Sequence, residues 1–345
     1  MPSPSVHDVA ARSGVSVSTV SRALRGVPGI SAATRKRVQE AAVELGYTAS
    51  PTASRLATGR TRTVAVIVPE LAKWFFAEVI AAAGRVLAEH GYDVLLVELS
   101  TAELRRAFFT GPGLRGRADG AIVVALQLGA DEFEALEGQG QSVVLVGSER
   151  QGAGSVSVDD RAGGRAAVRH LVNLGHERIA FLGIRHEPRS TLGGVPPAQR
   201  LLGYRDALAE AGLPEDPRWV LTAENSVDGG AGAVAGLLAE QGLPTAIAAA
   251  SDELAFGALR TLRGAGLRVP EDVSVVGYDN HGLAGAVDLT TMDHDVSGQG
   301  RAAAHALLAV LGAAPVAGPR VISPRLVVRG STAPPVDRAG STLPP

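Results

Sequence analysis

Residues 14–26 read GVSVSTVSRALRG, and this stretch describes a short helix with an unusual surface. Its opening glycine suits the left-handed end of a preceding helix, and Ser16 suits the N-cap of a helix that runs to about Leu24. Leu24 and either Val17 or Val20 are expected to face the core. The other positions carry serine, threonine and arginine, although serine and threonine compete with a helical backbone for hydrogen bonds. A helix face with these side chains predicts that the helix binds another molecule.

Two further helices flank this stretch. Ser5 is expected to cap a helix that ends near Ser13, and Ser31 is expected to cap a helix that runs through Leu45. Two short helices joined by a tight glycine-containing turn and backed by a third form a helix-turn-helix module. Residues 1–46 are therefore predicted to be an all-α, DNA-binding head.

The charge of the chain is unevenly distributed. The formal net charge is −2, yet residues 1–60 hold eight basic and three acidic residues, which leaves +5 on the head and −7 on the remainder. A basic head on an acidic body indicates that only the head meets a polyanion.

Other features of the composition exclude several classes of protein. There is no cysteine, so disulfides and thiolate-bound metals are excluded. No run of 18 apolar residues occurs, and the N-terminus lacks the basic start and apolar stretch of a signal peptide. We therefore expect no membrane contact and a cytoplasmic protein associated with the nucleoid.

The rest of the chain changes pattern at residue 64. Residues 47–63 read as a connector with one short helix, and apolar strands such as VAVIVP and SVVLVG then alternate with helices. Apolar strands separated by helices imply parallel sheets covered on both faces, in one large sheet or in two lobes. The proline-rich residues 331–345 are expected to be disordered.

At this point the residues resemble the LacI/GalR family of bacterial transcriptional regulators. The resemblance covers nearly the whole chain, and it is carried by eight motifs in order: VHDVAARSGVSVSTVSRALRG, SAATRKRVQEAAVELGY, LATGRTRTVAVIVPEL, HLVNLGHERIAFLG, QRLLGYRDAL, SDELAFGALRTLRGAGLRVPEDVSVVGYDN, LTTMDHD and PRLVVRGST.

The resemblance implies a homodimeric repressor that binds a palindromic DNA operator. Each subunit would have the helix-turn-helix head, a hinge helix and an α/β core (64–330) of two Rossmann-like lobes related to periplasmic binding proteins. The N-lobe would comprise about 62–158 and 290–319, and the C-lobe about 159–289 and 320–330. A small effector, most often a sugar in this family, would bind between the lobes, and no cofactor is implied.

The resemblance also assigns residues to the DNA. It implies that Ser16, Thr19 and Ser21 bind phosphate and that Val17, Ser18 and Arg22 read bases. Arg25, Ser31, Thr34 and Arg35 are placed like further phosphate contacts, and Leu56 in the hinge is placed like a leucine that wedges between base pairs. Three alternatives stay open: the module contacts a protein, Arg22 is merely solvated, or Ser31 serves only as a helix cap.

For the effector, the resemblance implies a site made of Phe75, Phe76, Arg200, Asn225, Ser251 and Asp279. The two phenylalanines, in the loop after the first strand, would supply an apolar wall. Two alternatives are that Arg200 and Asp279 pair only with each other and that Phe76 belongs to the core. The family's usual Asn-Pro before the phenylalanines is Lys73-Trp74 here, which puts a cation and an indole near the mouth.

Two rival classes fit the sequence poorly. A nucleotide-dependent enzyme needs a Gly-x-Gly-x-x-Gly or Walker loop, and DDRAGGRAAVRH has neither spacing. No Gly-x-Ser-x-Gly elbow occurs. A periplasmic binding protein needs a signal peptide and no basic head, whereas this chain shows the reverse.

Overall fold

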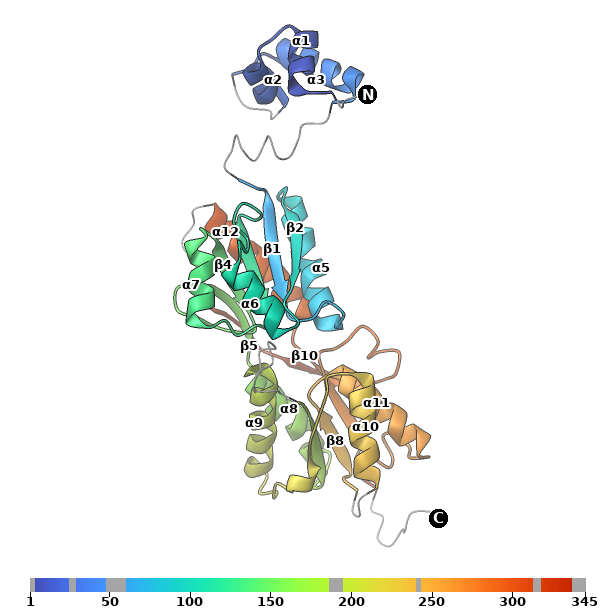
Figure 1. Ribbon diagram of the computed structural model, residues 1–345. Helices are drawn as coiled ribbons and strands as arrows, with labels where there is room; N and C mark the ends of the chain where they lie inside the picture. Colours follow the sequence, from blue (N-terminus) through green and yellow to red (C-terminus); the bar gives the residue numbers. More distant parts are fainter. Residues whose placement is uncertain are drawn as a thin grey trace. The chain divides into compact units, whose positions relative to one another are not determined.

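The computed structural model describes residues 4–24, 29–47, 60–185, 195–239, 243–312 and 318–336. The chain divides into two compact units, Met1–Arg62 and Thr63–Pro345, which are drawn in Figure 1. The predicted hinge residue Leu56 and the predicted phosphate contact Arg25 lie outside the described residues. No helix within the described ranges is both long and apolar enough to span a membrane.

The first unit contains the three expected helices, α1 (Val6–Ser13), α2 (Val17–Leu24) and α3 (Ala32–Leu45). The Ser5 side chain accepts a hydrogen bond from the Asp8 amide at the start of α1, and Gly14 ends α1 with a φ of 67°. This left-handed conformation carries no steric penalty for glycine, which has no Cβ. The caps thus set the turn between α1 and α2 as the sequence indicated.

The core of this unit is small and tightly packed. Val20 and Ala23 of α2 are buried, whereas Val17 and Leu24 lie only partly buried at its edge. Leu24 therefore packs against the core as predicted but is not fully buried, and the buried residues of α2 are Val20 and its small neighbour Ala23.

The second unit begins with a six-stranded, all-parallel sheet, which forms the N-lobe. Its order is β11-β5-β4-β3-β1-β2, with β1 (Thr63–Val68), β2 (Asp93–Glu98), β3 (Gly120–Val124), β4 (Ser142–Val146), β5 (Gly154–Val158) and β11 (Arg320–Ile322). Its helices are α5 (Trp74–Glu89), α6 (Ala102–Thr110), α7 (Ala130–Gly138) and α12 (Val296–Leu311).

Side chains alternate between the two faces of this sheet. Val64 and Val66 of β1 pack with α5 and α12, whereas Ile67 packs with Phe133 of α7 on the other face. The edge strand β2 departs from the prediction of strands buried on both faces, since Leu96 is 46% exposed. An edge strand has a neighbour on one side only, which leaves part of β2 uncovered.

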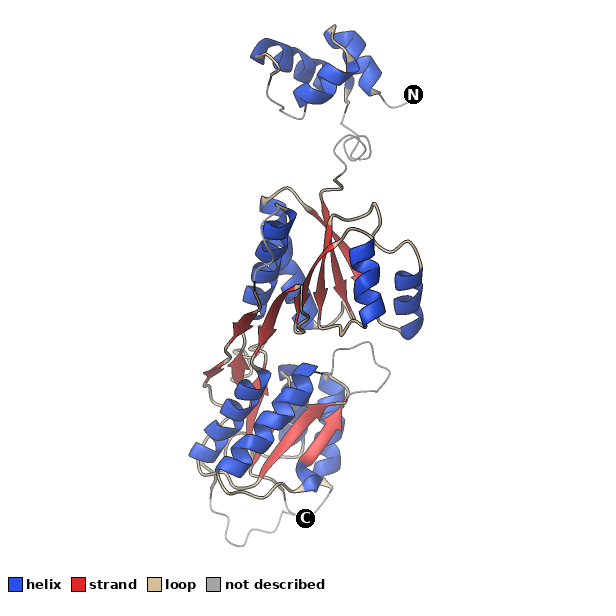
Figure 2. Cartoon of the chain, turned by 90° about the vertical axis from the view of Figure 1, so that its left-hand side faces the viewer, coloured by secondary structure: helices blue, strands red, loops and turns tan. Residues whose placement is uncertain are grey.

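A second six-stranded sheet forms the C-lobe, in the order β12-β10-β9-β8-β6-β7. Its strands are β6 (Ile179–Ile184), β7 (Val220–Ala223), β8 (Ala246–Ala249), β9 (Ser274–Tyr278), β10 (Thr290–Asp293) and β12 (Arg325–Val327). Only β12 is antiparallel to its neighbour. Helices α8 (Asp160–Asn173) and α9 (Val195–Glu210) pack together, as do α10 (Val227–Leu238) and α11 (Asp252–Gly264), and a short 3₁₀ helix, η1 (Pro217–Trp219), precedes β7. Both lobes are layered sheets covered by helices (Figure 2), so the expected fold class is confirmed.

The observed strand pairing places two lobe boundaries at other residues than the sequence predicted. Strand β10 pairs with β9, so residues 290–293 belong to the C-lobe and not to the N-lobe. Strand β11 pairs with β5, so residues 320–322 remain in the N-lobe sheet. Both strands are short; the partner of β11 is distant in sequence, whereas β10 pairs with β9, the strand that precedes it in the chain. Local patterning therefore gave no signal for either boundary.

The start of the C-terminal segment is ordered, which corrects the expectation of disorder from residue 331 onward. The Ser331 hydroxyl donates to the Val275 carbonyl at 2.6 Å and accepts from the Thr290 amide at 2.8 Å. Ser331 is buried, so these bonds anchor the segment to β9 and β10. The description ends at residue 336.

Helices α8 and α9 approach each other closely because Gly203 has no side chain. A Cβ at Gly203 would lie 2.2 Å from the Arg161 carbonyl oxygen and 2.5 Å from the Arg165 amide nitrogen. These neighbours are backbone atoms and cannot swing away. The two helices carry Asp160 and Arg200, so their spacing sets the geometry of the site described below.

Replacing Gly203 with alanine should separate α8 from α9 and lower the free energy of unfolding by about 1–3 kcal/mol. Urea unfolding, followed by the fluorescence of Trp219, measures this change. The matched control is Gly232→Ala in α10, where a Cβ would meet no atom within 4 Å. That variant should be neutral or stabilising by up to about 1 kcal/mol. Equal effects at both positions would contradict the close helix contact.

Candidate nucleic-acid interface and candidate ligand pocket

Helix α2 presents a polar face away from its core. Ser18 and Arg22 are exposed and lie four residues apart, so they share one side of the helix. Val17, Thr19 and Ser21 are partly exposed beside them. The predicted base-reading and phosphate-binding side chains of α2 thus reach the surface together, which an interface with DNA requires.

Hydroxyl groups cluster at the first turns of α2 and α3. The Ser16 hydroxyl lies 2.9 Å from those of Ser18 and Thr19, and it accepts a hydrogen bond from the Thr19 amide at 3.2 Å. Ser31 accepts from the Thr34 amide at 3.2 Å and donates to the Thr34 hydroxyl at 2.9 Å. The capping role of Ser31 is therefore confirmed, and its phosphate contact stays a prediction. Both clusters lie at helix N-termini, where free amides favour anions.

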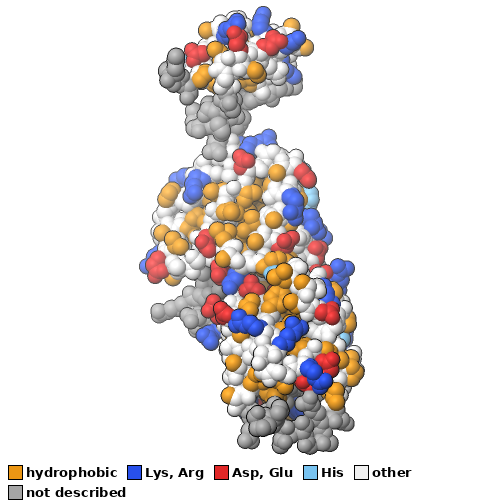
Figure 3. Space-filling model, turned by 90° about the vertical axis from the view of Figure 1, so that its right-hand side faces the viewer, with side chains coloured by type: hydrophobic (Ala, Val, Ile, Leu, Met, Phe, Trp, Pro, Cys, Tyr) orange, Lys and Arg blue, Asp and Glu red, His pale blue; other side chains and the backbone are white. Residues whose placement is uncertain are grey.

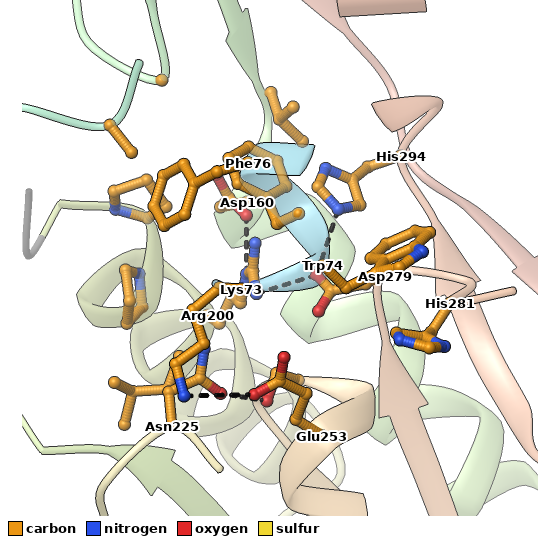
Figure 4. Close-up of a pocket in the computed structure, with 18 of the residues that line it drawn as sticks. Lys73, Trp74, Phe76, Asp160, Arg200, Asn225, Glu253, Asp279, His281 and His294 are labelled. Atoms are coloured by element: carbon orange, nitrogen blue, oxygen red, sulfur yellow. Dashed lines mark hydrogen bonds and ion pairs between the residues drawn. The ribbon is translucent and has the colours of Figure 1, made fainter. Parts of the chain in front are cut away.

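In the second unit, a cavity of about 140 Å³ lies between the N-lobe and the C-lobe, and Figure 4 shows the side chains around it. All the predicted effector residues line it: Phe75, Phe76, Arg200, Asn225, Ser251 and Asp279. The two phenylalanines lie in the first turn of α5 and not in a loop, because the helix already begins at Trp74. Phe76 is 6% exposed and also packs in the N-lobe core, so the core alternative applies to it as well.

Arg200 is buried and held by several groups at once. Its Nε donates to Asp160 Oδ1 at 2.7 Å, and its Nη1 donates to the Ala250 carbonyl at 2.6 Å and lies 3.6 Å from Asp279 Oδ1. The guanidinium also lies 3.7 Å from the ring centre of Tyr278. Burial alone would lower the pKa of Arg200, but the charge of Asp160, then Tyr278 and then the charge of Asp279 hold it above the usual value. Arg200 therefore stays charged, and its chief partner is Asp160.

Asp279 follows β9 in a rare backbone conformation. Its φ is 126°, a region that residues with a side chain seldom adopt and that often marks functional sites. The strained turn is held by the Asp279 amide, which donates to the Met292 carbonyl at 2.9 Å. His294 Nε2 lies 3.1 Å from Asp279 Oδ1. The turn thus places one carboxylate within reach of Arg200, His294 and the cavity.

A second carboxylate, Asp252, lies beneath this turn and is fully buried. Its Oδ1 accepts from the Thr291 hydroxyl at 2.6 Å, and its Oδ2 accepts from the His281 amide at 2.7 Å. Burial, and next the charge of Asp279, raise the pKa of Asp252 to about 7. This carboxylate therefore titrates near neutral pH.

Charged and aromatic residues of both lobes meet in the lining of the cavity. Lys73 Nζ, on the N-lobe, lies 3.6 Å from Glu253 Oε2 of the C-lobe and 3.9 Å from Glu70 Oε1. The Trp74 ring packs on His281 with their centres 4.5 Å apart. Burial and, more weakly, the charge of Asp279 raise the pKa of Glu253, while Lys73 opposes them. The Lys73-Trp74 pair thus lines the cavity, and its expected place at the mouth stays a prediction.

Asn225 and Ser251 form one unit on the C-lobe side. The Ser251 hydroxyl donates to Asn225 Oδ1 at 2.5 Å and accepts from the Leu254 amide as the cap of α11. Ser251 is 1% exposed, so it orients Asn225 and is itself almost inaccessible to a ligand.

The lining residues that sequence reasoning did not assign to the site include Asp160, Glu253, His281 and His294. The first three follow the carboxyl ends of β5, β8 and β9, and that position was a usable signal because open α/β sheets bind ligands there. His294 lies where the chain crosses between lobes, and no local pattern marked it. Within the described ranges, no three His, Asp or Glu side chains are grouped to hold a metal ion.

Comparison with known proteins found a matching protein-family model for each of the two units. A family model for bacterial regulatory proteins of the lacI family matches residues 5–50, and a model for a periplasmic binding protein-like domain matches residues 168–332. The transcriptional regulator MalR of Streptomyces coelicolor is 36% identical over 345 residues, which covers 94% of this chain and 96% of that protein.

Two solved structures extend the similarity to the fold. The lac repressor dimer bound to operator and the anti-inducer ONPF matches with a TM-score of 0.84 and 29% identity, covering 96% of this chain and 99% of that one. The transcriptional regulator CelR in complex with cellobiose matches with a TM-score of 0.69 and 32% identity, covering 95% and 99%.

A helix-turn-helix head joined to a two-lobed, periplasmic-binding-protein-like core defines a DNA-binding transcriptional regulator. Its relatives are regulators and not enzymes. The chain belongs to the lacI family of bacterial regulatory proteins, as its identity to MalR over nearly its full length shows.

Proposed function

We propose that this protein is a homodimeric repressor that binds a palindromic operator and responds to a small, sugar-like effector bound between its lobes. The observation that carries the proposal is the outer face of α2, where Ser18 and Arg22 are exposed while Val20 and Ala23 are buried. In a helix-turn-helix protein this helix lies in the major groove, and a dimer binds two half-sites about one helical turn (~34 Å) apart.

The surface of the N-lobe supports the dimer. Figure 3 shows the side of the second unit that carries α5 and β2, and apolar side chains gather there over the N-lobe. An edge strand with exposed apolar residues such as Leu96 is commonly covered by another chain.

The cavity supports regulation by a ligand. Its wall combines Lys73 and Trp74 of the N-lobe with Glu253 and His281 of the C-lobe. A molecule bound there contacts both lobes, so it stabilises one arrangement of the two lobes over another. A tenfold change in DNA affinity needs only about 1.4 kcal/mol of coupling between the two sites. The effector acts either as an inducer or as a co-repressor.

Selection of genomic DNA fragments by the purified protein at near-physiological salt tests this function, because salt sets the non-specific background. Recovery of one palindromic sequence is the expected result. Recovery of fragments without a common sequence, both alone and in the presence of cell-extract metabolites, would contradict it.

Arg22→Ala should relax the preference for one base pair in each half-site, with a loss of about 1–3 kcal/mol of discrimination, because a guanidinium can donate two hydrogen bonds to guanine. Binding to operators with every single base substitution measures this. Lys36→Ala, at an exposed α3 residue 3.9 Å from Glu40, is the control and should leave the preference unchanged. Uniform weakening by Arg22→Ala on all sequences would contradict a base-reading role.

A further inference from the structure

The cavity between the lobes carries more acidic than basic side chains. Its described lining includes the carboxylates of Glu70, Asp160, Glu253 and Asp279 against only two cations, Lys73 and Arg200. Counting only Asp, Glu, Lys and Arg, these four carboxylates and two cations leave a formal net charge of −2. An excess of carboxylates in a partly buried cavity is stabilised by a cation that enters it.

The two cations of the lining, Arg200 and Lys73, lie at different distances from the four carboxylates and compensate their charges unequally. Arg200 is held by Asp160 at 2.7 Å and is 3.6 Å from Asp279, so the closer ion pair is with Asp160. Lys73 is 3.6 Å or more from both of its acidic partners. Glu70, whose side chain is 39% exposed, lies 3.9 Å from Lys73. Among the less exposed carboxylates of the lining, Asp279 and Glu253 are each 3.6 Å from the nearest Lys or Arg nitrogen, farther than Asp160 is from Arg200. They are also close enough for Asp279 to raise the pKa of Glu253.

Aromatic rings stand beside these carboxylates. Trp74 and His281 pack with centres 4.5 Å apart, and Phe75 stacks on His294 at 5.9 Å. All four rings line the cavity. Tryptophan and phenylalanine faces attract ammonium groups and also pack on the C–H faces of sugar rings. The lining thus combines groups that bind a cation with groups that bind a sugar ring.

We propose that the effector is a small polyhydroxylated molecule with a protonated amine, in the chemical class of an amino sugar, held by Glu253 and Asp279 beside Trp74. This inference rests on the proposed function, because it names the ligand of the same cavity. Lys73 is a specificity-determining residue in this arrangement, since its ammonium group competes with the ligand for Glu253.

Two variants should change binding in opposite directions. Glu253→Gln removes a carboxylate that holds the amine. The affinity for an amino sugar should therefore exceed the affinity for the matching neutral sugar by less than threefold. Lys73→Gln removes the competing cation, so amino sugars should bind several times more tightly. If the Lys73–Glu253 pair only holds the lobes together, both variants should weaken every ligand alike. Glu137→Gln, at an exposed residue of α7, is the matched control and should change nothing.

Calorimetric titration of the full-length protein near pH 7 tests the proposal with matched pairs of ligands: glucosamine and glucose, galactosamine and galactose, and the glucosamine disaccharide of chitosan and cellobiose. N-acetylglucosamine serves as a neutral control. At least one amine should bind tenfold or more tightly than its neutral partner, because a charge-assisted hydrogen bond is roughly twice as strong as a neutral one.

Equal or tighter binding of the neutral partners would overturn the proposal, and so would the absence of binding by every amine. A loss of binding in both Lys73→Gln and Glu253→Gln would overturn the role of this pair in specificity. Operator selection by the wild-type protein tests the regulator function separately. A protein that selects an operator but prefers neutral sugars would therefore contradict only this inference.

Discussion

Replacing Arg200 with methionine is expected to lower the free energy of unfolding by about 3–5 kcal/mol, the usual effect of removing one partner from a buried ion pair. Methionine fills much of the same space, but it leaves Asp160 without its cation and the Ala250 carbonyl without its donor. Asp160 and Arg200 are 6% and 7% exposed, so water reaches them only from the cavity and replaces these bonds poorly. Urea unfolding of the full-length variant, followed by fluorescence, measures the loss.

Arg161→Met is the matched control for this prediction. Arg161 forms two hydrogen bonds with Asp206, at 2.6 and 2.8 Å, but its side chain is 54% exposed. A surface pair of this kind contributes about 0–1 kcal/mol. The double variant Arg200→Met/Asp160→Asn should recover part of the stability, since it removes the uncompensated charge. If Arg200→Met cost no more than Arg161→Met, the buried pair would contribute no more to the free energy of unfolding than an exposed pair between the same two helices.

The elements that the sequence predicted well are those with strong local signals. Ser5, Gly14 and Ser31 mark the helix ends of the head through capping, which depends on a few adjacent residues. The valine-rich strands β1 and β4 are visible because both of their faces are buried. In contrast, β11 and β12 have three residues each, and only their partners in distant parts of the chain define them.

The candidate site divides in the same way. Resemblance and strand-end position located Arg200 and Asp279, and the cavity brings them together as expected. The chief partner of Arg200 is Asp160, 40 residues earlier in the chain, and no local pattern connects the two. The pairing follows from the close packing of α8 on α9, which depends on Gly203 and on tertiary structure. Sequence thus predicted which side chains reach the cavity better than it predicted how they pair.

Asp252→Asn should make the protein more stable than wild type at alkaline pH. The free energy of unfolding of the variant minus that of the wild type should grow by about 2–3 kcal/mol between pH 5 and pH 8. The pKa of Asp252 is about 7 in the folded state and near 3.8 in the unfolded state, because burial and Asp279 disfavour its charge. Between these values the folded protein binds the extra proton. The stability from the protonated form is therefore complete below pH 3.8 and is lost as the pH rises through 7.

Asparagine resembles the protonated carboxyl group, so this variant keeps the hydrogen bonds while it removes the titration. Its oxygen can accept from the His281 amide, and its amide can donate to the Thr291 hydroxyl, which can rotate to accept. Unfolding free energies of wild type and variant at several pH values measure the effect, and their difference cancels the other titrating groups. Asp228→Asn, at a side chain that is 88% exposed, is the control: it measures how loss of a surface carboxylate changes the pH dependence of the unfolding free energy. If Asp252→Asn and Asp228→Asn showed the same pH profile, Asp252 would not be the buried acid that titrates near neutrality.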